Sequence, residues 1–582
     1  MNRKFAVRIV DLSLVALVAY FAWGKFQNRA PRVEPNAFAA NVELEPLRNL
    51  AVQDVGRIKS FDSFARGHMR TVGGPYNVDG NEPVFSYLDL MLNPGKYHNK
   101  EIIYVKRAIR PHLSRAMSDA GVSSDVTNKF IKAGLIAPST YWLPPVQTEL
   151  QKLEQDVIRT QKFVNMLSWA MGTADAHRLS RNLAIIPSPT GNDKTPWLTG
   201  EQLWGMGFMQ DGHDHGQANM GVPGLDETLS TELVANWNKL VDTWRAEDAA
   251  GASAAIASLA DNLVKVNPSL YPDVEKLSLE STYFKMKAFV WVWIVYALAA
   301  IPLVMFIAYR MKGAYVVGTV ILVIAFALHT LAIGMRWYIS GRIPNANMFE
   351  AVLASVWFGV LGAFFFEVWV RKTNMRGLFF FGSSICAMVA MMCQQFMPTV
   401  LKSDIDNMMP VLDDIWLYIH TNMIIWSYAL IGIAAIIALL YLRYRLGGGD
   451  PSAARVGGAG SLILEGSTPK GDRFLVDEKG STGKVLDAAT MVALEFAFVT
   501  LWAGLVMGAI WADHSWGRPW GWDPKEVFAL CTFVIFIILV HVRLKVRDKG
   551  FWTAILAVVG CAVMLFNWIV INFVITGLHS YA

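Results

Sequence analysis

Apolar residues are distributed unevenly along this chain of 582 residues. Beyond position 286 the sequence consists largely of long apolar runs, whereas most of the first half mixes polar and apolar positions as a globular domain does. A helix needs about 20 apolar residues to cross the hydrocarbon core of a bilayer. Seven runs reach this length: Ala288–Tyr309, Ala314–Met335, Met348–Val370, Gly377–Met397, Ile415–Leu442, Thr490–Trp511 and Phe551–Ile575. The pattern predicts a polytopic membrane protein.

Two further runs are weaker candidates for membrane spans. Val527–Val542 is short, but it reaches full length if its helix begins at Pro524, because proline is favoured in the first turn of a helix. The N-terminal run Phe5–Phe26 is interrupted by Arg8 and Asp11, which lie three positions apart on one helical face and can pair. No small-residue cleavage site follows this run, which favours an uncleaved anchor over a signal peptide. The chain is therefore expected to cross the membrane nine times.

These elements predict an all-α polytopic membrane protein with a mainly helical external domain. Three regions follow: an N-terminal membrane anchor at 1–26, an external domain at 27–284, and an eight-helix membrane domain at 285–582 with a tryptophan-rich loop at 511–526. Stretches of the external domain near 145–180 and 226–266 have helical periodicity. Segments rich in proline and glycine near 73–95 and 187–225 are expected to be loops.

Basic residues indicate the direction of insertion, because cytoplasmic loops carry an excess of lysine and arginine. One alternate set of short loops contains nine: Arg310, Lys312, Arg371, Lys372, Arg376, Arg543, Lys545, Arg547 and Lys549. The opposite set contains three: Arg342, Lys402 and Arg518. The sequence therefore predicts a cytoplasmic N-terminus, with the external domain, the tryptophan-rich loop and the C-terminus on the other side of the membrane.

Charge and cysteine spacing exclude several classes of protein. The formal net charge of +5 is too small for a nucleic-acid-binding protein, so no nucleic acid is expected as a partner. The four cysteines, Cys386, Cys393, Cys531 and Cys561, form no CxxC, so the chain has no dithiol motif and no CxxCH haem-attachment site of its own. The segment Asp211-Gly-His-Asp-His215 has an HxH spacing that suits a metal ion but lacks an obvious third ligand. A solvated polar loop is the competing interpretation.

The tryptophan-rich loop is the most unusual segment of the sequence. It holds four tryptophans among twelve residues: Trp511, Trp516, Trp520 and Trp522. Asp523 is expected to cap the next helix, with Glu526 completing a capping box. Tryptophan belts occur in many membrane proteins, but four indoles in one loop exceed what a belt needs. They indicate a flat apolar platform, beside which Arg518 and Lys525 suit the anionic groups of a planar ligand such as haem.

Histidines in or beside the apolar runs are the second candidate for chemistry. They are His329, His420, His514, His541 and His579. Ionisable groups at membrane depth are costly and therefore suggest a function. For each histidine taken alone, a neutral ring that is hydrogen-bonded to a neighbouring helix is an equally good interpretation.

Four motifs follow one another in the second half of the chain. Arg336-Trp-Tyr-Ile-Ser-Gly-Arg342 precedes Asn347-Met-Phe-Glu350, and Trp416-Leu-Tyr-Ile-His420 leads to Ser427-Tyr428. The third motif, Trp520-Gly-Trp-Asp-Pro-Lys-Glu526, is similar to the WWD motif of haem-handling proteins, and the last is Gly577-Leu-His-Ser-Tyr581. Together they resemble the CcsA/ResC family of system II cytochrome c biogenesis over roughly 285–582. A weaker likeness, from Gly56–Ala65 through Leu92-Asn-Pro94, is to the external region that precedes the CcsA-like half in longer fused relatives.

The resemblance implies functional residues. His420 and His579 match the two external histidines that ligate the iron of haem b, and His541 matches a histidine of an inner site on the haem entry path. The other residues expected to bind haem are Trp511, Trp516, Trp520, Trp522, Asp523 and Arg518. Asp413, Asp414 or the adjacent backbone is expected to hold the second ring nitrogen of His420.

The family joins haem to the CxxCH of exported apocytochrome c, which implies haem delivery across a bacterial cytoplasmic (inner) membrane by a haem lyase, with a thiol-reducing protein as a partner. Two positions depart from the family. His514 stands where relatives carry an acidic residue, and its role, like that of His329, stays open. The companion CcsB/ResB protein supplies a transmembrane histidine that Phe5–Phe26 lacks, so a separate CcsB/ResB-like chain is expected. A haem exporter that serves a separate chaperone and a non-catalytic scaffold are the alternatives.

Overall fold

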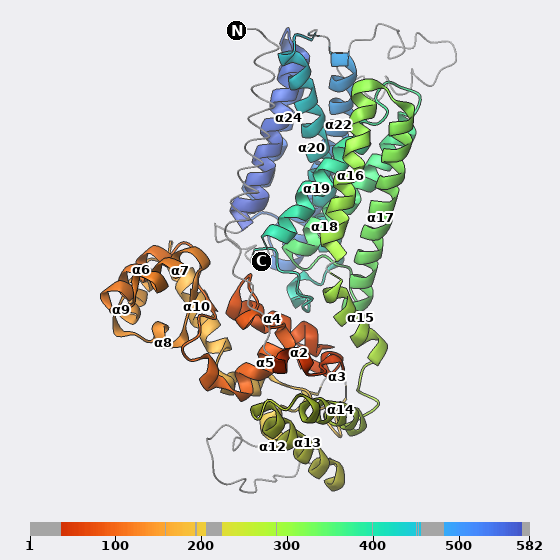
Figure 1. The fold of residues 1–582 in the computed structure, drawn as a ribbon. Coiled ribbons are helices and arrows are strands. Elements are labelled where there is room, and N and C mark those ends of the chain that lie inside the picture. Colours follow the sequence, from red (N-terminus) through yellow and green to blue (C-terminus); the bar gives the residue numbers. More distant parts are fainter. Residues whose placement is uncertain are drawn as a thin grey trace. The chain divides into compact units, whose positions relative to one another are not determined.

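The computed structural model describes residues 37–157, 159–192, 195–204, 224–286, 288–397, 400–449, 451, 453–454 and 482–572 (Figure 1). The described chain divides into two compact units. The bundle unit contains the described residues from 288 to 403 and from 408 to 572, and the N-terminal unit contains those from 37 to 286 together with Asp404–Asn407. The expected membrane anchor at 1–26 lies outside the described residues.

The bundle unit is built from apolar helices that run roughly along one direction (Figure 1). They are α16 Ala288–Tyr309, α17 Lys312–Ser340, α18 Met348–Trp369, α19 Leu378–Phe396, α20 Ile415–Leu446, α22 Thr482–Trp516, α23 Pro524–Lys545 and α24 Lys549–Leu565, the last continued by the π-helix η5 Phe566–Ile571. Within the described residues, eight helices are long and apolar enough to cross a membrane. The predicted fold class is confirmed, and α23 begins at Pro524 as its capping residues indicated.

Helix α20 packs against four other helices of the bundle unit, α18, α19, α22 and α24. Small residues let the backbones approach closely. A Cβ added to Gly359 would lie 2.9 Å from the Cβ of Ala429, and one added to Gly504 would lie 2.6 Å from Cδ1 of Ile424. Lipid gives helices little hydrophobic reason to associate, so close packing of this kind holds them together. Helix α20 is therefore a firmly held element on which a site can be built.

Buried charges are paired at both ends of the bundle. The carboxylate of Glu350 lies 2.8 Å from Arg336 and 2.9 Å from Arg342. At the other end, Arg543 donates to both carboxylate oxygens of Asp487, at 2.8 and 2.6 Å. A buried charge without a partner is strongly destabilising. Arg543 thus belongs to the helix packing at the end of α23 rather than to a loop.

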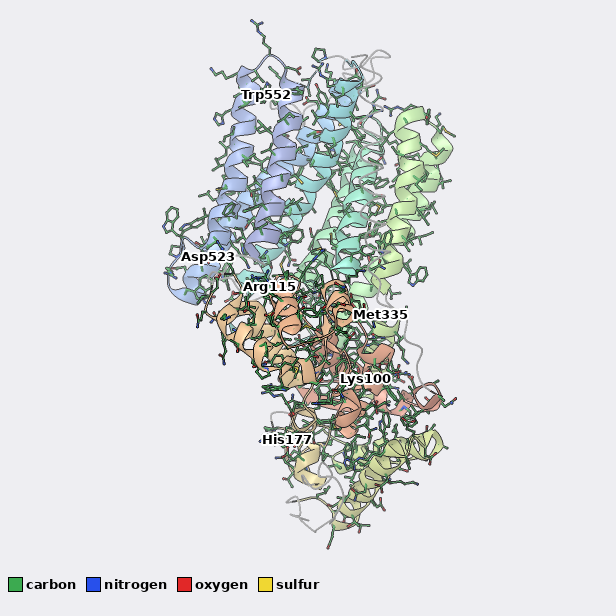
Figure 2. The ribbon with its side chains drawn as sticks, turned by 60° about the vertical axis from the view of Figure 1, so that its left-hand side comes forward. Lys100, Arg115, His177, Met335, Asp523 and Trp552 are labelled. Carbon is green, nitrogen blue, oxygen red and sulfur yellow. The ribbon has the colours of Figure 1, made fainter. Side chains whose placement is uncertain are left out.

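Two labelled side chains mark the ends of the bundle. Asp523, just before α23, and Trp552, early in α24, lie near opposite ends in Figure 2. Helix α23 therefore runs from one end of the bundle to the other. The end marked by Asp523 also holds the start of α20 and the end of α22, because consecutive spans alternate in direction.

The described part of the N-terminal unit is mainly helical, with two short antiparallel pairs of strands. Its helices are α2 Ala37–Asn41, α3 Glu45–Arg48, α4 Phe61–Gly73, η1 Val78–Gly80, α5 Pro83–Leu92, η2 Pro94–Tyr97, α6 Arg110–Asp119, α7 Ser124–Ala133, α8 Pro138–Tyr141, α9 Pro144–Glu154, α10 Gln161–Thr173, α11 Ala176–Asn182, α12 Gly200–Trp204, α13 Glu227–Arg245, α14 Ala249–Val266 and α15 Val274–Lys285. The strands are β1 Ala51–Asp54, paired with β2 Arg57–Ser60, and β3 Ile103–Tyr104, paired with β4 Leu135–Ile136. The helices expected within 145–180 and 226–266 are confirmed.

The expected loop across 73–95 is wrong in its second half. Helix α5 occupies it, and every residue of α5 after Pro83 is buried. Proline fixes a helical φ at the first position of a helix, where its missing N–H costs no hydrogen bond. Pro83 therefore begins a buried helix here. Of the other expected loop, α12 occupies a short part, and residues 205–223 lie outside the described chain.

A tetrapeptide from far along the chain, Asp404–Asn407, belongs to the N-terminal unit. The carboxylate of Asp404 lies 3.0 Å from Arg70 of α4. Arg57 of β2 donates a 2.7 Å hydrogen bond to the carbonyl of Ile405 and pairs with Glu280 at 2.7 Å. The segment that resembles fused relatives thus supplies one of the side chains that hold this tetrapeptide.

Candidate functional site

His420 lies in the second turn of α20 with its ring against α22. The helix is capped by Asp414, whose side chain accepts a 2.7 Å hydrogen bond from the backbone N–H of Trp416. The Nδ1 atom of His420 donates a 2.7 Å hydrogen bond to the backbone carbonyl of Gly504 in α22. A carbonyl oxygen only accepts, so the neutral ring carries its proton on Nδ1 and its lone pair on Nε2. This is the tautomer in which Nε2 can bind a metal.

Two glycines of α22 make room for the His420 ring. A Cβ added to Gly508 would lie 2.6 Å from Cε1 and 2.7 Å from Nδ1 of His420, closer than real side chains approach. Gly504 precedes Gly508 by one turn, so the two form a GxxxG step, the spacing that allows close helix packing in membranes. Neither glycine was predicted to be part of the site, although the GxxxG spacing is visible in the sequence.

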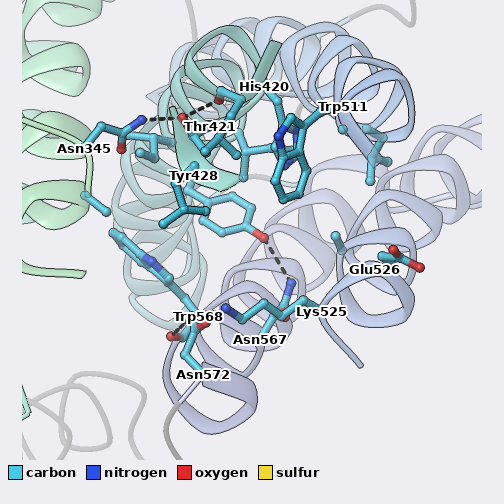
Figure 3. A pocket seen from close by; sticks show the side chains of 18 of the residues that line it. Asn345, His420, Thr421, Tyr428, Trp511, Lys525, Glu526, Asn567, Trp568 and Asn572 are labelled. Carbon is cyan, nitrogen blue, oxygen red and sulfur yellow. Dashed lines mark hydrogen bonds between the residues drawn. The ribbon is translucent and has the colours of Figure 1, made fainter. Parts of the chain in front are cut away.

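A cavity lies beside His420 (Figure 3). Parts of α18, α20, α22, α23 and η5 line it, together with Leu412, Asn572 and the segments before α18 and α23. Its polar lining residues are Asn345, Asn347, His420, Thr421, Tyr428, Lys525, Glu526, Asn567 and Asn572. Much of the remaining wall is apolar, with Trp511, Trp520 and Trp568 as its largest side chains. The cavity therefore combines an imidazole, aromatic walls and a few polar groups.

Two of the four predicted tryptophans, Trp511 and Trp520, line this cavity. Trp511 is only 1% exposed, and Trp516 packs edge-on against it with ring centroids 4.8 Å apart. Trp522 is 75% exposed and lies edge-on to Trp520 at 6.0 Å. Its φ of +55° is strained for a bulky residue. The four indoles thus form two edge-on pairs with one cavity-lining member each, rather than one flat platform.

The tryptophan-rich loop starts later than predicted, because α22 continues to Trp516. The capping box at its other end is confirmed: the side chain of Asp523 accepts from the N–H of Lys525 at 3.1 Å, and that of Glu526 accepts from the N–H of Asp523 at 3.2 Å. Asp523 is nearly fully buried and caps the start of α23. Arg518 is exposed and is not among the lining residues, whereas Lys525 is.

The acceptor of the His420 Nδ1 proton is Gly504 rather than Asp413 or Asp414. Asp414 instead lies 2.8 Å from Nδ1 of His514, and this contact joins the start of α20 to the end of α22. Partial burial raises the pKa of Asp414, but hydrogen bonds from Trp416 and His514 outweigh it and hold this pKa below its usual range. His514, which the sequence left without a role, therefore has a structural one.

Two predicted histidines lie away from the cavity. His541 is exposed on α23, where its Nδ1 donates a 2.8 Å hydrogen bond to the carbonyl of Ile537. His329 is fully buried, and its Nδ1 lies 3.2 Å from the hydroxyl of Tyr296 across the α16–α17 contact. Neither lines the cavity around His420.

His579, the second expected axial ligand, falls in 573–582, outside the described residues, as does the candidate metal segment 211–215. In the part of the chain that the structure describes, no group of three or more His, Cys, Asp or Glu is arranged to hold a metal ion. A haem site does not need such a group, because the porphyrin supplies four ligands and the protein adds only axial ones. One oriented imidazole in an aromatic cavity therefore fits haem better than a bare metal ion.

Sequence reasoning gave no role to Tyr428, Asn567 and Asn572, which also line the cavity. Tyr428 stood in a quoted motif without a function. Asn567 and Asn572 are polar residues within an apolar run, and polar groups at membrane depth are usually functional. That signal was present in the sequence.

The fold and the cavity define a polytopic helical membrane protein with an oriented histidine beside a cavity that has aromatic walls. Residues 345–579 match the family described as "Cytochrome C assembly protein". The cytochrome c biogenesis protein CcsA of a Prochlorococcus marinus strain is 30% identical over 267 residues, which cover 45% of this chain and 83% of that relative. CcsA of Guillardia theta is 28% identical over 275 residues, 47% of this chain and 87% of the relative. Protein NrfI of Wolinella succinogenes is 28% identical over 270 residues, 44% of this chain and 25% of NrfI.

The chain belongs to the CcsA family of cytochrome c biogenesis proteins. The matched region 345–579 contains the cavity and extends to His579.

Proposed function

We propose that this protein delivers haem across the membrane and attaches it covalently to apocytochrome c. Membership of the CcsA family gives it a role in cytochrome c maturation, and that role involves haem. The observation that carries the finer proposal is the orientation of His420. Its bond to Gly504 sets Nε2 as the metal-binding nitrogen beside a cavity walled by Trp511 and Trp520.

The ligand in this proposal is haem b, held between His420 and His579 as axial ligands. Trp511 and Trp520 contact the porphyrin, and Trp516 and Trp522 pack edge-on against them. His541, exposed on α23, belongs to an inner site whose second ligand comes from a CcsB/ResB-like partner chain. These roles rest on the family motifs and on the positions of the described side chains.

Attachment is an addition reaction. Each cysteine S–H of CxxCH adds across a haem vinyl group: sulfur bonds to one vinyl carbon, hydrogen goes to the other, and nothing leaves. No oxidant is needed, but both thiols must be reduced, which calls for a thiol-reducing protein as a partner. The role of this chain is to hold the porphyrin in a fixed position with its vinyl groups accessible, so that the reaction gains from proximity and orientation.

The compartment follows from the same chemistry. Apocytochrome c acts outside the cytoplasm, and the basic residues favour a bacterial cytoplasmic membrane with a cytoplasmic N-terminus. Residues 27–284 and the tryptophan-rich loop then face the periplasm, residues 1–26 form an anchor, and 285–582 form the haem-handling membrane domain.

The test is transfer of haem by the purified protein. The protein is loaded with haem in detergent and incubated with a reduced CxxCH peptide, and covalent haem is measured by the mass of the peptide and its absorption spectrum. A peptide with serine at both cysteine positions is the control. The proposal predicts a haem adduct on the cysteine peptide alone. Bound haem without transfer would favour an exporter that serves a separate chaperone, and no bound haem would favour a scaffold.

A further inference from the structure

One side of the cavity is polar and is built by two helices. Tyr428 on α20 is 6% exposed, and Asn567 on η5 is 5% exposed; both line the cavity, as does Asn572. Figure 3 shows Asn567, Trp568 and Asn572 on one side of the cavity, with His420 and Trp511 on the other side. The π-helix η5 spans Phe566–Ile571, and π turns inside α-helices often occur at functional sites. This turn helps to bring Asn567 and Trp568 to the cavity.

The hydrogen bond between these residues leaves a donor available. The Nδ2 atom of Asn567 donates to the hydroxyl oxygen of Tyr428 at 3.1 Å. An amide nitrogen only donates, so the Tyr428 oxygen is the acceptor, and the hydroxyl proton is not used in this bond. Asn567 thus orients the Tyr428 hydroxyl as a hydrogen-bond donor at the cavity.

The lining offers two donors for an anion. Lys525 is the one cationic side chain among the described lining residues, and Glu526 is the one carboxylate. Glu526 accepts hydrogen bonds from the backbone N–H groups of Gly521 at 2.9 Å and Asp523 at 3.2 Å, so this carboxylate is engaged in the capping box. Lys525 supplies an ammonium and Tyr428 a hydroxyl to the same cavity. An anion that accepts from both donors is a carboxylate.

We infer that Tyr428, oriented by Asn567, and Lys525 bind the propionate carboxylates of haem. The inference rests on the proposed function. Tyr428 lies eight residues beyond His420, about 12 Å further along α20 and away from the tryptophan-rich loop. The propionates and the vinyl groups occupy opposite edges of the porphyrin. Holding the propionate edge at Tyr428 turns the vinyl edge towards the tryptophan-rich loop, where both cysteine thiols of an exported polypeptide can reach it. These residues are positioning residues for the attachment reaction.

The first experiment varies the ligand. Haem-free protein is titrated with iron protoporphyrin IX, with its dimethyl ester, in which both propionates are neutral, and with iron mesoporphyrin, in which ethyl groups replace the vinyl groups. Affinity is followed by the Soret absorbance. The ester is expected to bind at least about tenfold more weakly than haem, because hydrogen bonds to a charged group are lost. Mesohaem is expected to bind like haem. Equal affinity for haem and ester would overturn the inference.

The second experiment varies the protein. Tyr428→Phe and Asn567→Leu should each weaken haem binding by about tenfold but leave the affinity for the ester unchanged, because the ester has no carboxylate to lose. Tyr441→Phe is the matched control: it is a buried tyrosine on the same helix that does not line the cavity. If a Tyr428 variant that elutes like the parent protein loses haem and ester affinity equally, Tyr428 supports the fold and not the propionates.

The outcomes separate the two proposals. Haem bound with a bis-imidazole spectrum but without discrimination against the ester would leave the proposed function standing and overturn the propionate assignment alone. Failure of the parent protein to bind any of the three porphyrins would overturn both.

Discussion

The imidazole of His420 and the carbonyl of Gly504, 84 positions apart in the chain, are joined by a 2.7 Å hydrogen bond. The bond crosses the contact between α20 and α22 and uses a backbone atom of α22. No side-chain substitution at position 504 can remove this acceptor directly. The orientation of the ring is therefore set by how closely the two helices pack, which depends on Gly504 and Gly508.

Replacing Gly508 with alanine should displace the His420 ring. The new Cβ would lie 2.6 Å from Cε1, so the ring must turn away and give up its bond to Gly504. Loss of the group that orients a metal-binding histidine typically lowers affinity by about 10- to 100-fold, and this is the decrease expected in haem affinity. Gly334→Ala on α17 is the control, because its Cβ meets nothing within 4 Å. Unchanged haem affinity in Gly508→Ala would contradict this account of the ring.

Removing the imidazole of His420 should create a vacancy that a small ligand can fill. His420→Gly is expected to lose most of its haem during purification and to stop cytochrome c synthesis. Added imidazole should restore part of both, because it occupies the free coordination position. His579→Gly is expected to behave in the same way. A His420→Gly protein that keeps haem with an unchanged absorption spectrum would rule out axial ligation.

The two tryptophans of the motif Trp520–Glu526 should contribute differently to haem binding. Trp520 lines the cavity, so Trp520→Ala is expected to weaken haem binding by at least about tenfold through lost contact area. Trp522 is 75% exposed and does not line the cavity, so Trp522→Ala should have a smaller effect. Imidazole should rescue neither variant. Haem titration of both proteins measures the difference, and a larger loss in Trp522→Ala would reverse the assignment.

His541 is predicted to act with a partner chain. It is exposed on α23 and its Nδ1 is bonded to Ile537, which directs the metal-binding nitrogen away from its own helix backbone. His541→Ala should lower haem content only when the CcsB/ResB-like partner is co-expressed, because the inner site needs ligands from both chains. Haem content of the purified complex and of the chain alone gives the comparison. An identical haem content in parent and variant complexes would remove the inner site.

Sidedness can be measured with single cysteines. In a background with the native cysteines replaced by serine, Ser253→Cys and Ser515→Cys should react with an impermeant thiol reagent in spheroplasts, and Ser461→Cys should react only after lysis. The expectation rests on the asymmetry of basic residues. Arg543 is buried against Asp487 and contributes less to that asymmetry than a loop residue. Labelling at position 461 in intact spheroplasts would show that the orientation is wrong.

The start of α23 shows how far local sequence reasoning reaches. Asp523, Pro524 and Glu526 specify a helix start through contacts within four residues, and the structure confirms it. Pro83 shows the limit, because the same residue type that suggests a loop begins a buried helix when the following residues pack into a core. Local patterns therefore located helices better than they distinguished loops.

The contacts within the site were harder to predict from the sequence than the fold was. His420 was identified from its motif, but its acceptor was sought nearby at Asp413 and Asp414, because spacing gives information only on neighbours in the chain. Gly504 comes from another helix, and only packing brings it to His420. The same holds for the pairing of Tyr428 with Asn567, which lie 139 positions apart.

The choice of a carbonyl as the acceptor for His420 also bears on the basicity of the His420 ring. A carboxylate draws the imidazole proton towards itself and makes the metal-binding nitrogen more basic, whereas a neutral carbonyl such as that of Gly504 does so less. A less basic axial ligand stabilises ferric iron less, so a haem held by His420 would have a higher reduction potential than one held by a carboxylate-supported histidine. With His420 as a haem ligand, as proposed above, the backbone of α22 would thereby favour the reduced form of the iron.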